Sequence, residues 1–386
     1  MCDLGLRQFL LLMSLLVPIG CNPAEGRLAG AGGATGGGTG GGGAGGALGP
    51  CGSTDTSPRS LRSWSVTCTD GVSHVVTEFG FPAGSAPGII TAGPDGNLWF
   101  TERAVTGPTG HQWYGGSNIG RITPEGSITE FVTHSVVSDL TTGPDGNLWY
   151  TDFSEVARLS PSGELTKFPL PDGVRGPASI VTGPDSALWF TESMGIGRVS
   201  LEGAITTFQL PISPDNLHPI IAGSLVSAND GNLWFTEDNG IGIGRMSRDG
   251  TFTDFALPTA DAIPSGLVLG PEGGLWFSEG LTNRGAAPGN STIGRVDYSG
   301  VITESTIPVT TNGGVSLLAG PDGNLWFKGE GDDYNYTLIG RVSPTGEITV
   351  CPRIAGYSVS SIVFGPDGNL WFMDAGPGCS IDRLSL

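Results

Sequence analysis

The chain has 386 residues, with 66 glycines, 28 prolines and a formal net charge of −19 at pH 7. Nine tryptophans and 16 phenylalanines exclude an intrinsically disordered chain, because disordered compositions lack large apolar side chains. The negative charge argues against polyanionic partners, so we expect the folded part to bind neither nucleic acid nor an anionic membrane. So much glycine and proline beside aromatic residues is typical of a turn-rich all-β protein.

Residues 1–21 have the pattern of an export signal. Arg7 precedes an apolar stretch, Phe9 to Val17, that is too short to span a bilayer. Gly20 and Cys21 resemble the end of a bacterial lipobox, which makes Cys21 the predicted lipidation site. Pro18 departs from the usual aliphatic residue, so plain signal cleavage and secretion is the alternative. The sequence therefore predicts an exported lipoprotein, at the cell surface or in the periplasm, that touches the membrane only through this anchor.

Residues 22–50 are predicted to be a flexible tether. Their stretch 29–49 consists almost entirely of glycine, alanine and threonine, which cannot build a core. Residues 51–72 follow as an N-terminal extension before the repeats begin.

From residue 73 to residue 386, one motif recurs seven times. It reads Gly-Pro-Asp-Gly-Asn-Leu-Trp-Phe from Gly93, with variants further on. The tryptophans of the seven copies lie 40 to 50 residues apart, at Trp99, Trp149, Trp189, Trp234, Trp276, Trp326 and Trp371. A period near 45 residues is that of a four-stranded propeller blade. The sequence predicts an all-β, seven-bladed β-propeller over 73–386.

Each copy can be divided into four strands, which in the first copy include residues 88–92, 98–102, 119–121 and 127–131. Proline sets φ at the turn between the first two, and the aspartate side chain can bond to the backbone two residues on. The third strand carries Ile-Gly-Arg, and an arginine repeated in this way is expected to form hydrogen bonds between blades. The repeated arginines are Arg121, Arg198, Arg245, Arg295 and Arg341.

The two ends of the repeat array complement each other. Residues 74–79 form a fourth strand with no blade before it, whereas the last copy stops after its third strand at 381–383. We therefore expect the N-terminal strand to complete the last blade, which closes the ring and removes free sheet edges. We expect the propeller to be a monomer.

Strand alternation places the variable loops on one face of the ring, opposite the Gly-Pro-Asp-Gly turns. Two of these loops carry aromatic and polar residues, which are typical of recognition surfaces. Packing of these side chains against their own blades is the alternative. The predicted binding residues are His111, Trp113, Tyr114, Asp333 and Tyr334.

Four cysteines remain after the signal residue Cys2 and the lipidation site Cys21 are set aside. An even number in an exported protein indicates disulfides. Cys351 and Cys379 are both expected on the variable-loop face, so a Cys351–Cys379 bond could join the last two blades. Cys51–Cys68 is then the expected local bond.

The repeat GPDGNLWFTE…IGRI…ITEF resembles the streptogramin (virginiamycin B) lyase family of seven-bladed propellers over residues 73–386. This resemblance implies the opening of a cyclic depsipeptide by elimination, with Mg²⁺ as cofactor and a histidine as general base. In the family, histidines stand five residues before the turn glycine of the last two blades. The positions of these histidines correspond to Val315 and Ser360 here, and the family's acid positions correspond to Ser358 and Ala375.

None of these four residues matches the family's histidine or acid. The histidine with a comparable offset is His218, five residues before Gly223 in the fourth blade, which makes it the candidate catalytic residue. A polar residue lining the channel is the alternative role for His218.

Carboxylates end the second strand in six of the seven copies. A ring of acids could hold a divalent cation, and Glu192 and Glu237 are the candidate ligands. A residue repeated in every blade is more often a structural one that bonds to backbone amides. The six carboxylates are Glu102, Asp152, Glu192, Glu237, Glu279 and Asp374.

Taken as a sequence, the chain is expected to be an exported binding scaffold that recognises a small molecule, peptide, glycan or protein. The alternative is a Mg²⁺-dependent carbon–oxygen lyase, or a related hydrolase, with a rearranged active site. Fold resemblance by itself cannot choose between them, because propellers carry many unrelated functions.

Overall fold

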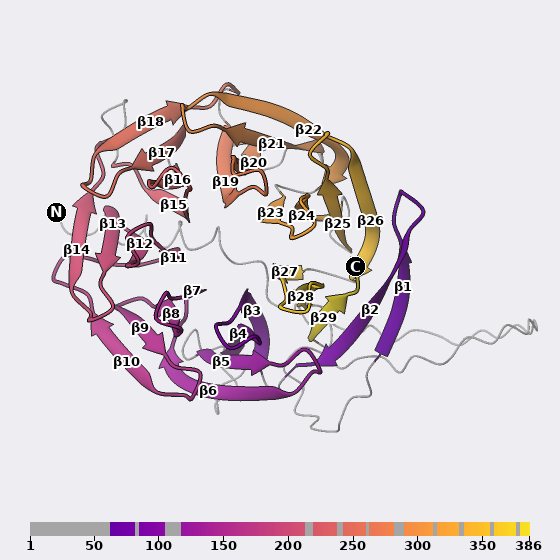
Figure 1. Cartoon of the computed structure of the whole chain (residues 1–386), viewed down its shortest axis with the longest axis horizontal. Coiled ribbons are helices and arrows are strands. Elements are labelled where there is room, and N and C mark those ends of the chain that lie inside the picture. Colours follow the sequence, from indigo (N-terminus) through magenta and orange to yellow (C-terminus); the bar gives the residue numbers. More distant parts are fainter. Residues whose placement is uncertain are drawn as a thin grey trace, which may run out of the picture.

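The computed structural model describes residues 62–81, 85–104, 117–212, 219–237, 242–259, 262–281, 289–311, 315–331, 336–355, 359–375 and 379–386. Within these ranges the secondary structure consists of strands, and no helix is long and apolar enough to cross a membrane. The strands form seven antiparallel sheets around a central opening (Figure 1). The predicted seven-bladed propeller is confirmed.

Blades one to six each contain four strands in sequence order. Blade one contains β3 (Ser85–Ala92), β4 (Leu98–Ala104), β5 (Ser117–Ile122) and β6 (Ile128–Ser135), and blade two contains β7 (Asp139–Thr142), β8 (Leu148–Thr151), β9 (Glu155–Leu159) and β10 (Leu165–Pro169). Blade three contains β11 (Ile180–Thr182), β12 (Leu188–Glu192), β13 (Gly195–Val199) and β14 (Ile205–Gln209), and blade four contains β15 (Ala222–Ser227), β16 (Leu233–Glu237), β17 (Gly242–Met246) and β18 (Phe252–Ala256). Blade five contains β19 (Ala262–Leu269), β20 (Leu275–Leu281), β21 (Gly289–Val296) and β22 (Ile302–Thr311), and blade six contains β23 (Ser316–Ala319), β24 (Leu325–Glu330), β25 (Thr337–Val342) and β26 (Ile348–Ala355).

Blade seven is assembled from both ends of the folded chain. Its sheet has the order β1 (Arg62–Thr67), β2 (Ser73–Gly80), β29 (Ser380–Leu384), β28 (Leu370–Asp374) and β27 (Val359–Phe364). Strand β2 pairs with β29 from Val76 to Gly80, and Val76 and Leu384 are fully buried where they meet. The predicted closure of the ring by the N-terminal strand is confirmed.

One hydrogen-bond arrangement explains the repeated motif. In blade one, Asp95 Oδ1 accepts a hydrogen bond from Trp99 Nε1 at 2.9 Å and another from the Asn97 backbone at 3.3 Å. Gly93 lies against the same indole, because a Cβ there would stand 2.0 Å from the ring. The equivalent acid–tryptophan bonds join Asp145 to Trp149, Asp185 to Trp189, Asp230 to Trp234, Glu272 to Trp276, Asp322 to Trp326 and Asp367 to Trp371.

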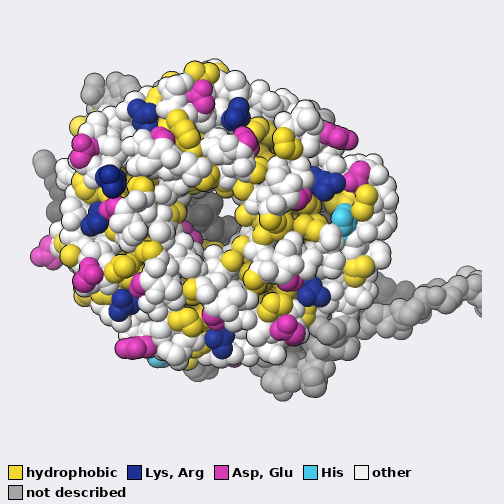
Figure 2. All heavy atoms as spheres, in the orientation of Figure 1, with side chains coloured by type: hydrophobic (Ala, Val, Ile, Leu, Met, Phe, Trp, Pro, Cys, Tyr) yellow, Lys and Arg dark blue, Asp and Glu magenta, His cyan; other side chains and the backbone are white. Residues whose placement is uncertain are grey.

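Some of the third-strand arginines connect neighbouring blades, as predicted, whereas the ion pairs of Arg198 and Arg295 are with the turn acid of their own blade. Arg121 forms an ion pair with Asp95 at 3.2 Å, and it also donates to the carbonyl of Pro161 in blade two. Its guanidinium lies over the Trp99 ring, 5.5 Å from the centroid. Figure 2 shows basic and acidic side chains alternating around this face of the ring. The same link to the next blade is formed by Arg158 to Leu201, Arg245 to Tyr298 and Arg383 to Pro124.

Strand β1 adds a fifth strand to blade seven, where the sequence analysis expected only an extension before residue 73. It pairs with β2 in register from Arg62 opposite Glu78 to Thr67 opposite Ser73. Val66 is buried with Val76 in the core of this region. The segment is short and mostly polar, so its alternation is a weak signal without knowledge of the strand it joins.

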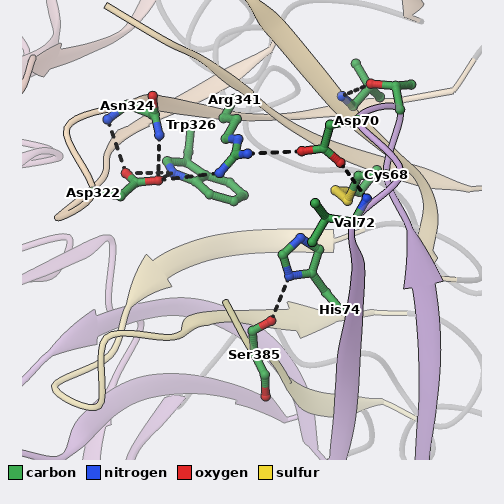
Figure 3. A network of polar contacts seen from close by, with 12 residues as sticks. Cys68, Asp70, Val72, His74, Asp322, Asn324, Trp326, Arg341 and Ser385 are labelled. Carbon is green, nitrogen blue, oxygen red and sulfur yellow. Dashed lines mark hydrogen bonds and ion pairs between the residues drawn. A yellow bond between two sulfur atoms is a disulfide. The ribbon is translucent and has the colours of Figure 1, made fainter.

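Both predicted disulfide pairings are wrong, because Cys68 is bonded to Cys351. The hairpin turn after β1 lies beside β26 of blade six, where Thr69 N donates to Val350 O at 2.8 Å. Arg341 of blade six pairs with Asp70 in the same turn at 3.0 Å (Figure 3). Cys379 is also disulfide-bonded, and Cys51 lies outside the described residues.

Replacing Gly197 by alanine is expected to lower the free energy of unfolding by about 1–3 kcal/mol. Gly197 faces the fully buried Phe190 across the ladder, and a Cβ would stand 2.1 Å from its ring. Urea unfolding measures the change. Gly280→Ala is the control, because no atom lies within 4 Å of a Cβ there. Equal stabilities for the two variants would contradict close packing at the third-strand glycine.

Candidate binding site at the ends of the innermost strands

One position recurs in or next to the innermost strand of every blade, five residues before the first residue of the turn between the first and second strands. It holds glycine, alanine or serine in every blade except blade six, where it is Val315. In blades one, five and seven it contacts the second strand of the same blade. At Gly88 the approach is so close that a Cβ would lie 2.1 Å from Thr101 Oγ1. In blade five, Ser265 Oγ and Ser278 Oγ form a hydrogen bond of 2.9 Å. The seven residues are Gly88, Ser138, Ala178, Gly223, Ser265, Val315 and Ser360.

The predicted offset of His218 is wrong. The turn of blade four begins at Ala228, whose backbone N–H bonds to Asn232 O just as that of Gly93 bonds to Asn97 O. The residue five before this turn is therefore Gly223 itself. His218 lies ten residues before the turn and outside the described residues, so the structure does not place it at an innermost strand.

The residues at the expected lyase positions do not fit a metal ion with a histidine base. Val315 is only 3% exposed and packs in an apolar cluster with Leu317, Phe327 and other aliphatic residues. Ser360 Oγ donates to the carbonyl of Met373 at 3.4 Å. Ala375 offers no donor atom, and Ser358 lies outside the described residues. In the described part of the chain, no three His, Cys, Asp or Glu side chains are arranged to hold a metal.

Two of the six second-strand carboxylates bond to the backbone of the loop that follows them. Asp152 Oδ1 accepts from the amides of Ser154 and Glu155 at 2.8 and 3.0 Å. Glu192 Oε2 accepts from the amide of Met194 at 3.0 Å. These contacts agree with the structural alternative that the sequence analysis left open for the repeated acids.

Three others face a second carboxylate of their own blade. Glu237 ends the second strand of blade four and interacts with Asp254 on the fourth strand. A Cβ at the third-strand Gly242 would stand 2.5 Å from Asp254 Oδ1. Burial, and then the charge of Asp254, raise the pKa of Glu237 to about 8. Glu192 and Glu237 therefore act in separate blades, and the structure does not bring these two predicted ligands together. The other pairs are Glu102 with Glu130 and Glu279 with Glu304.

Asp139 is a half-buried acid on the innermost strand of blade two that the sequence analysis missed. Its carboxylate accepts from the amide of Leu140 and, across the blade boundary, from the amide of Ile180, both at 2.9 Å. Burial raises its pKa to about 6 even though these hydrogen bonds favour the charged form. Ser179 and Ser361 make the same link to the following blade, so Asp139 is part of the inter-blade contact.

Lys328 is a second group that the sequence analysis missed. It lies in β24, and its amine donates to the carbonyl of Val359 on the innermost strand of blade seven. Burial lowers the pKa of this amine. The sequence does carry a signal for this residue, because the second strand of blade six reads Leu-Trp-Phe-Lys where blades one, three and four read Leu-Trp-Phe-Thr. The corresponding residues of the other blades are Thr101, Thr151, Thr191, Thr236, Ser278 and Met373.

The predicted loop binding residues, His111, Trp113, Tyr114, Asp333 and Tyr334, lie outside the described residues. The same holds for the lipidation site Cys21 and the tether. These assignments stay predictions.

Comparison with known proteins gives one family and several solved structures. A model of the virginiamycin B lyase family matches residues 69–225 and 104–287. Virginiamycin B lyase from Staphylococcus aureus, in a catalytically inactive form with quinupristin, is 29% identical over 81% of this chain and 99% of that chain, with a TM-score of 0.66. A streptogramin B lyase structure is 28% identical, covers 81% and 97% of the two chains, and has a TM-score of 0.64.

More distant structures share the fold alone. The extracellular domain of a hybrid two-component system from B. thetaiotaomicron is 15% identical, with a TM-score of 0.56 over 78% of this chain and 40% of that chain. A search of the curated proteins gives no match.

Proposed function

The chain belongs to the virginiamycin B lyase family, and we propose that it is a ligand-binding propeller of that family that does not catalyse the lyase reaction. Its ligand would be a small molecule or peptide held where the innermost strands begin on the variable-loop face. A glycan or a protein segment remains within the same proposal.

Val315 is the observation that carries this proposal. A general base needs a titratable atom beside the proton it removes, and a metal ligand needs a lone pair. Val315 has neither, and its side chain is packed into the apolar core between blades five and six. Ser360, at the second family position, bonds to the backbone of Met373. Restoring the lyase site would require repacking as well as substitution.

One of these relatives supports binding at this fold. It is a catalytically inactive form with quinupristin, so in that protein a ligand is held without turnover. The alignment with it covers almost the whole of that chain and 81% of this one. A shared scaffold and lost catalytic side chains favour retained binding over retained chemistry.

The proposal places the propeller outside the cytoplasm, tethered through residues 22–50 to a lipid on Cys21, or secreted if the signal is simply cleaved. The Cys68–Cys351 disulfide supports this location, because such bonds persist in oxidising compartments. Mass spectrometry of the membrane fraction, searching for a diacylated peptide beginning at Cys21, tests the anchor.

Incubation of the full-length protein with quinupristin, with and without Mg²⁺, is expected to leave the cyclic compound intact. Liquid chromatography with mass spectrometry distinguishes the linear product from the ring. Virginiamycin B lyase from S. aureus serves as the positive control, and circular dichroism verifies that the protein is folded. Linear product from the wild type that disappears in His218→Ala would overturn the proposal and identify a lyase with a displaced base.

A further inference from the structure

We propose that Lys328 is the ligand-binding cation of this propeller, and that it takes a carboxylate oxygen of the ligand between blades six and seven. The inference rests on the proposed binding function and adds the chemical class of the ligand. No residue of this kind was predicted at the site from the sequence.

The position of Lys328 brings its amine to the boundary between two innermost strands. Lys328 stands opposite Ser316 of β23 in the strand register, and its Nζ reaches the carbonyl of Val359 in β27. Figure 1 shows β23 and β27 as neighbours at the wall of the central opening. Lys328 is half-buried and Ser316 is exposed, so a solute in the channel can approach the amine.

The amine of Lys328 has more donors than the protein uses. An ammonium group has three N–H donors, and among the described residues it has a single hydrogen-bond acceptor, Val359 O. No carboxylate of the described part lies within ion-pair distance of it, in contrast to Lys167, which pairs with Glu155 at 2.5 Å. Glu330, on the same strand, favours the charged form through its field without such a contact.

A half-buried ammonium without an ion pair is costly, because it loses hydration that one carbonyl does not replace. A ligand carboxylate would supply both the opposite charge and acceptor atoms for the remaining donors, in charge-assisted hydrogen bonds. The exposed hydroxyl of Ser316 is a further donor opposite Lys328. Amine and hydroxyl together match a carboxylate better than a neutral group.

A purely structural role does not account for the lysine. In blade two, Thr151 Oγ1 already bonds to Ala178 O of the next blade at 2.6 Å, which is the same kind of link that Lys328 makes to Val359. A hydroxyl is therefore sufficient to connect neighbouring blades at this position. Compared with a hydroxyl, the lysine adds a positive charge and two further N–H donors. The charge and the unpaired donors both lower the stability of the folded protein unless a ligand supplies a second acceptor.

Thermal unfolding of the full-length protein tests the inference with N-acetylglycine as the carboxylate probe and N-acetylglycinamide as its neutral match, at constant ionic strength. The acid is expected to raise the melting temperature of the wild type by roughly 1–3 °C near saturation, and the amide is expected to leave it unchanged. Lys328→Thr, which restores the hydroxyl of the other blades, and Lys328→Met, which keeps the aliphatic stem, should both lose the response. Lys167→Met should keep it.

Equal effects of the acid and the amide on the wild type would overturn the inference, and so would a response that survives in both Lys328 variants. Such results leave the proposed binding function standing, because they concern only the charge of the ligand. Turnover of quinupristin would instead overturn the proposed function, whatever the probes show at Lys328.

Discussion

Raising the pH from 5 to 9 is expected to lower the melting temperature of this protein by roughly 5–10 °C, because buried carboxyl pairs must give up protons that the folded state holds. Glu102 faces Glu130, Glu237 faces Asp254 and Glu279 faces Glu304 within blades one, four and five. A hydrogen bond between two carboxyl groups requires a proton on one of them.

The direction of this effect follows from the pKa values. Burial, followed by the neighbouring carboxylate, raises the pKa of Glu102 and Glu237 from 4.5 to about 8 and that of Glu279 to about 7. The folded protein therefore binds protons that the unfolded chain has released above pH 4.5. This stabilisation is fully present below about pH 4.5 and is lost as the pH rises through 7 to 8. We expect roughly 2 kcal/mol from each pair.

The turn aspartates act in the opposite direction at low pH. Hydrogen bonds to Asn97 and Trp99 hold the pKa of Asp95 below its usual value although burial opposes them, so its contribution is lost as the pH falls below about 3.8. Asp145, Asp185, Asp322 and Asp367 have pKa values lowered in the same direction. Stability should therefore be greatest near pH 5.

Differential scanning calorimetry between pH 4 and 9 measures this dependence. Glu102→Gln, Glu237→Gln and Glu279→Gln should flatten it above pH 5, because the amide donates a hydrogen bond to the second carboxylate without needing a proton. Glu192→Gln is the matched control, because the fourth strand of its own blade carries no second acid. Thr207 occupies the fourth-strand position that holds the second acid in blades one, four and five. A melting temperature that is constant or rises from pH 5 to 9 would show that the pairs are not held by a proton.

Removing the Cys68–Cys351 bond is expected to lower the free energy of unfolding by about 2–5 kcal/mol. The bond closes a loop with a sequence separation of 283 residues, so its loss frees an unusually long segment of the unfolded chain. It also holds the β1–β2 hairpin, which completes blade seven, against β26 of blade six. The double variant Cys68→Ala/Cys351→Ala should therefore lose stability chiefly at the closure of the ring.

Guanidinium unfolding and hydrogen exchange separate the two parts of this prediction. Exchange in the double variant should increase first in β1, β2 and β29, before the core of blades two to five responds. The control is Asp70→Asn, which weakens the ion pair with Arg341 beside the disulfide and should cost less than 1 kcal/mol. Uniformly increased exchange in all blades would contradict a role specific to ring closure.

The repeated local motif determined the fold without help from tertiary structure. Gly-Pro-Asp-Gly specifies a turn, the aspartate reaches the tryptophan four residues on, and both contacts lie within one copy of the repeat. The unmatched fourth strand at 74–79 identified the closure of the ring, because a strand with no partner at one end must pair with the incomplete blade at the other.

Contacts between distant segments could not be obtained in this way. Cys68 meets Cys351 because β1 joins blade seven beside blade six, whereas sequence proximity favoured Cys51. The amine of Lys328 meets the carbonyl of Val359 only across a blade boundary. Glu237 on the second strand meets Asp254 on the fourth strand across the third, where a Cβ at Gly242 would stand 2.5 Å from Asp254 Oδ1. The sequence by itself therefore determined the blade, its turns and their number, since these depend on neighbouring residues. Only the tertiary structure decided which charges and thiols face one another, because that depends on how blades pack.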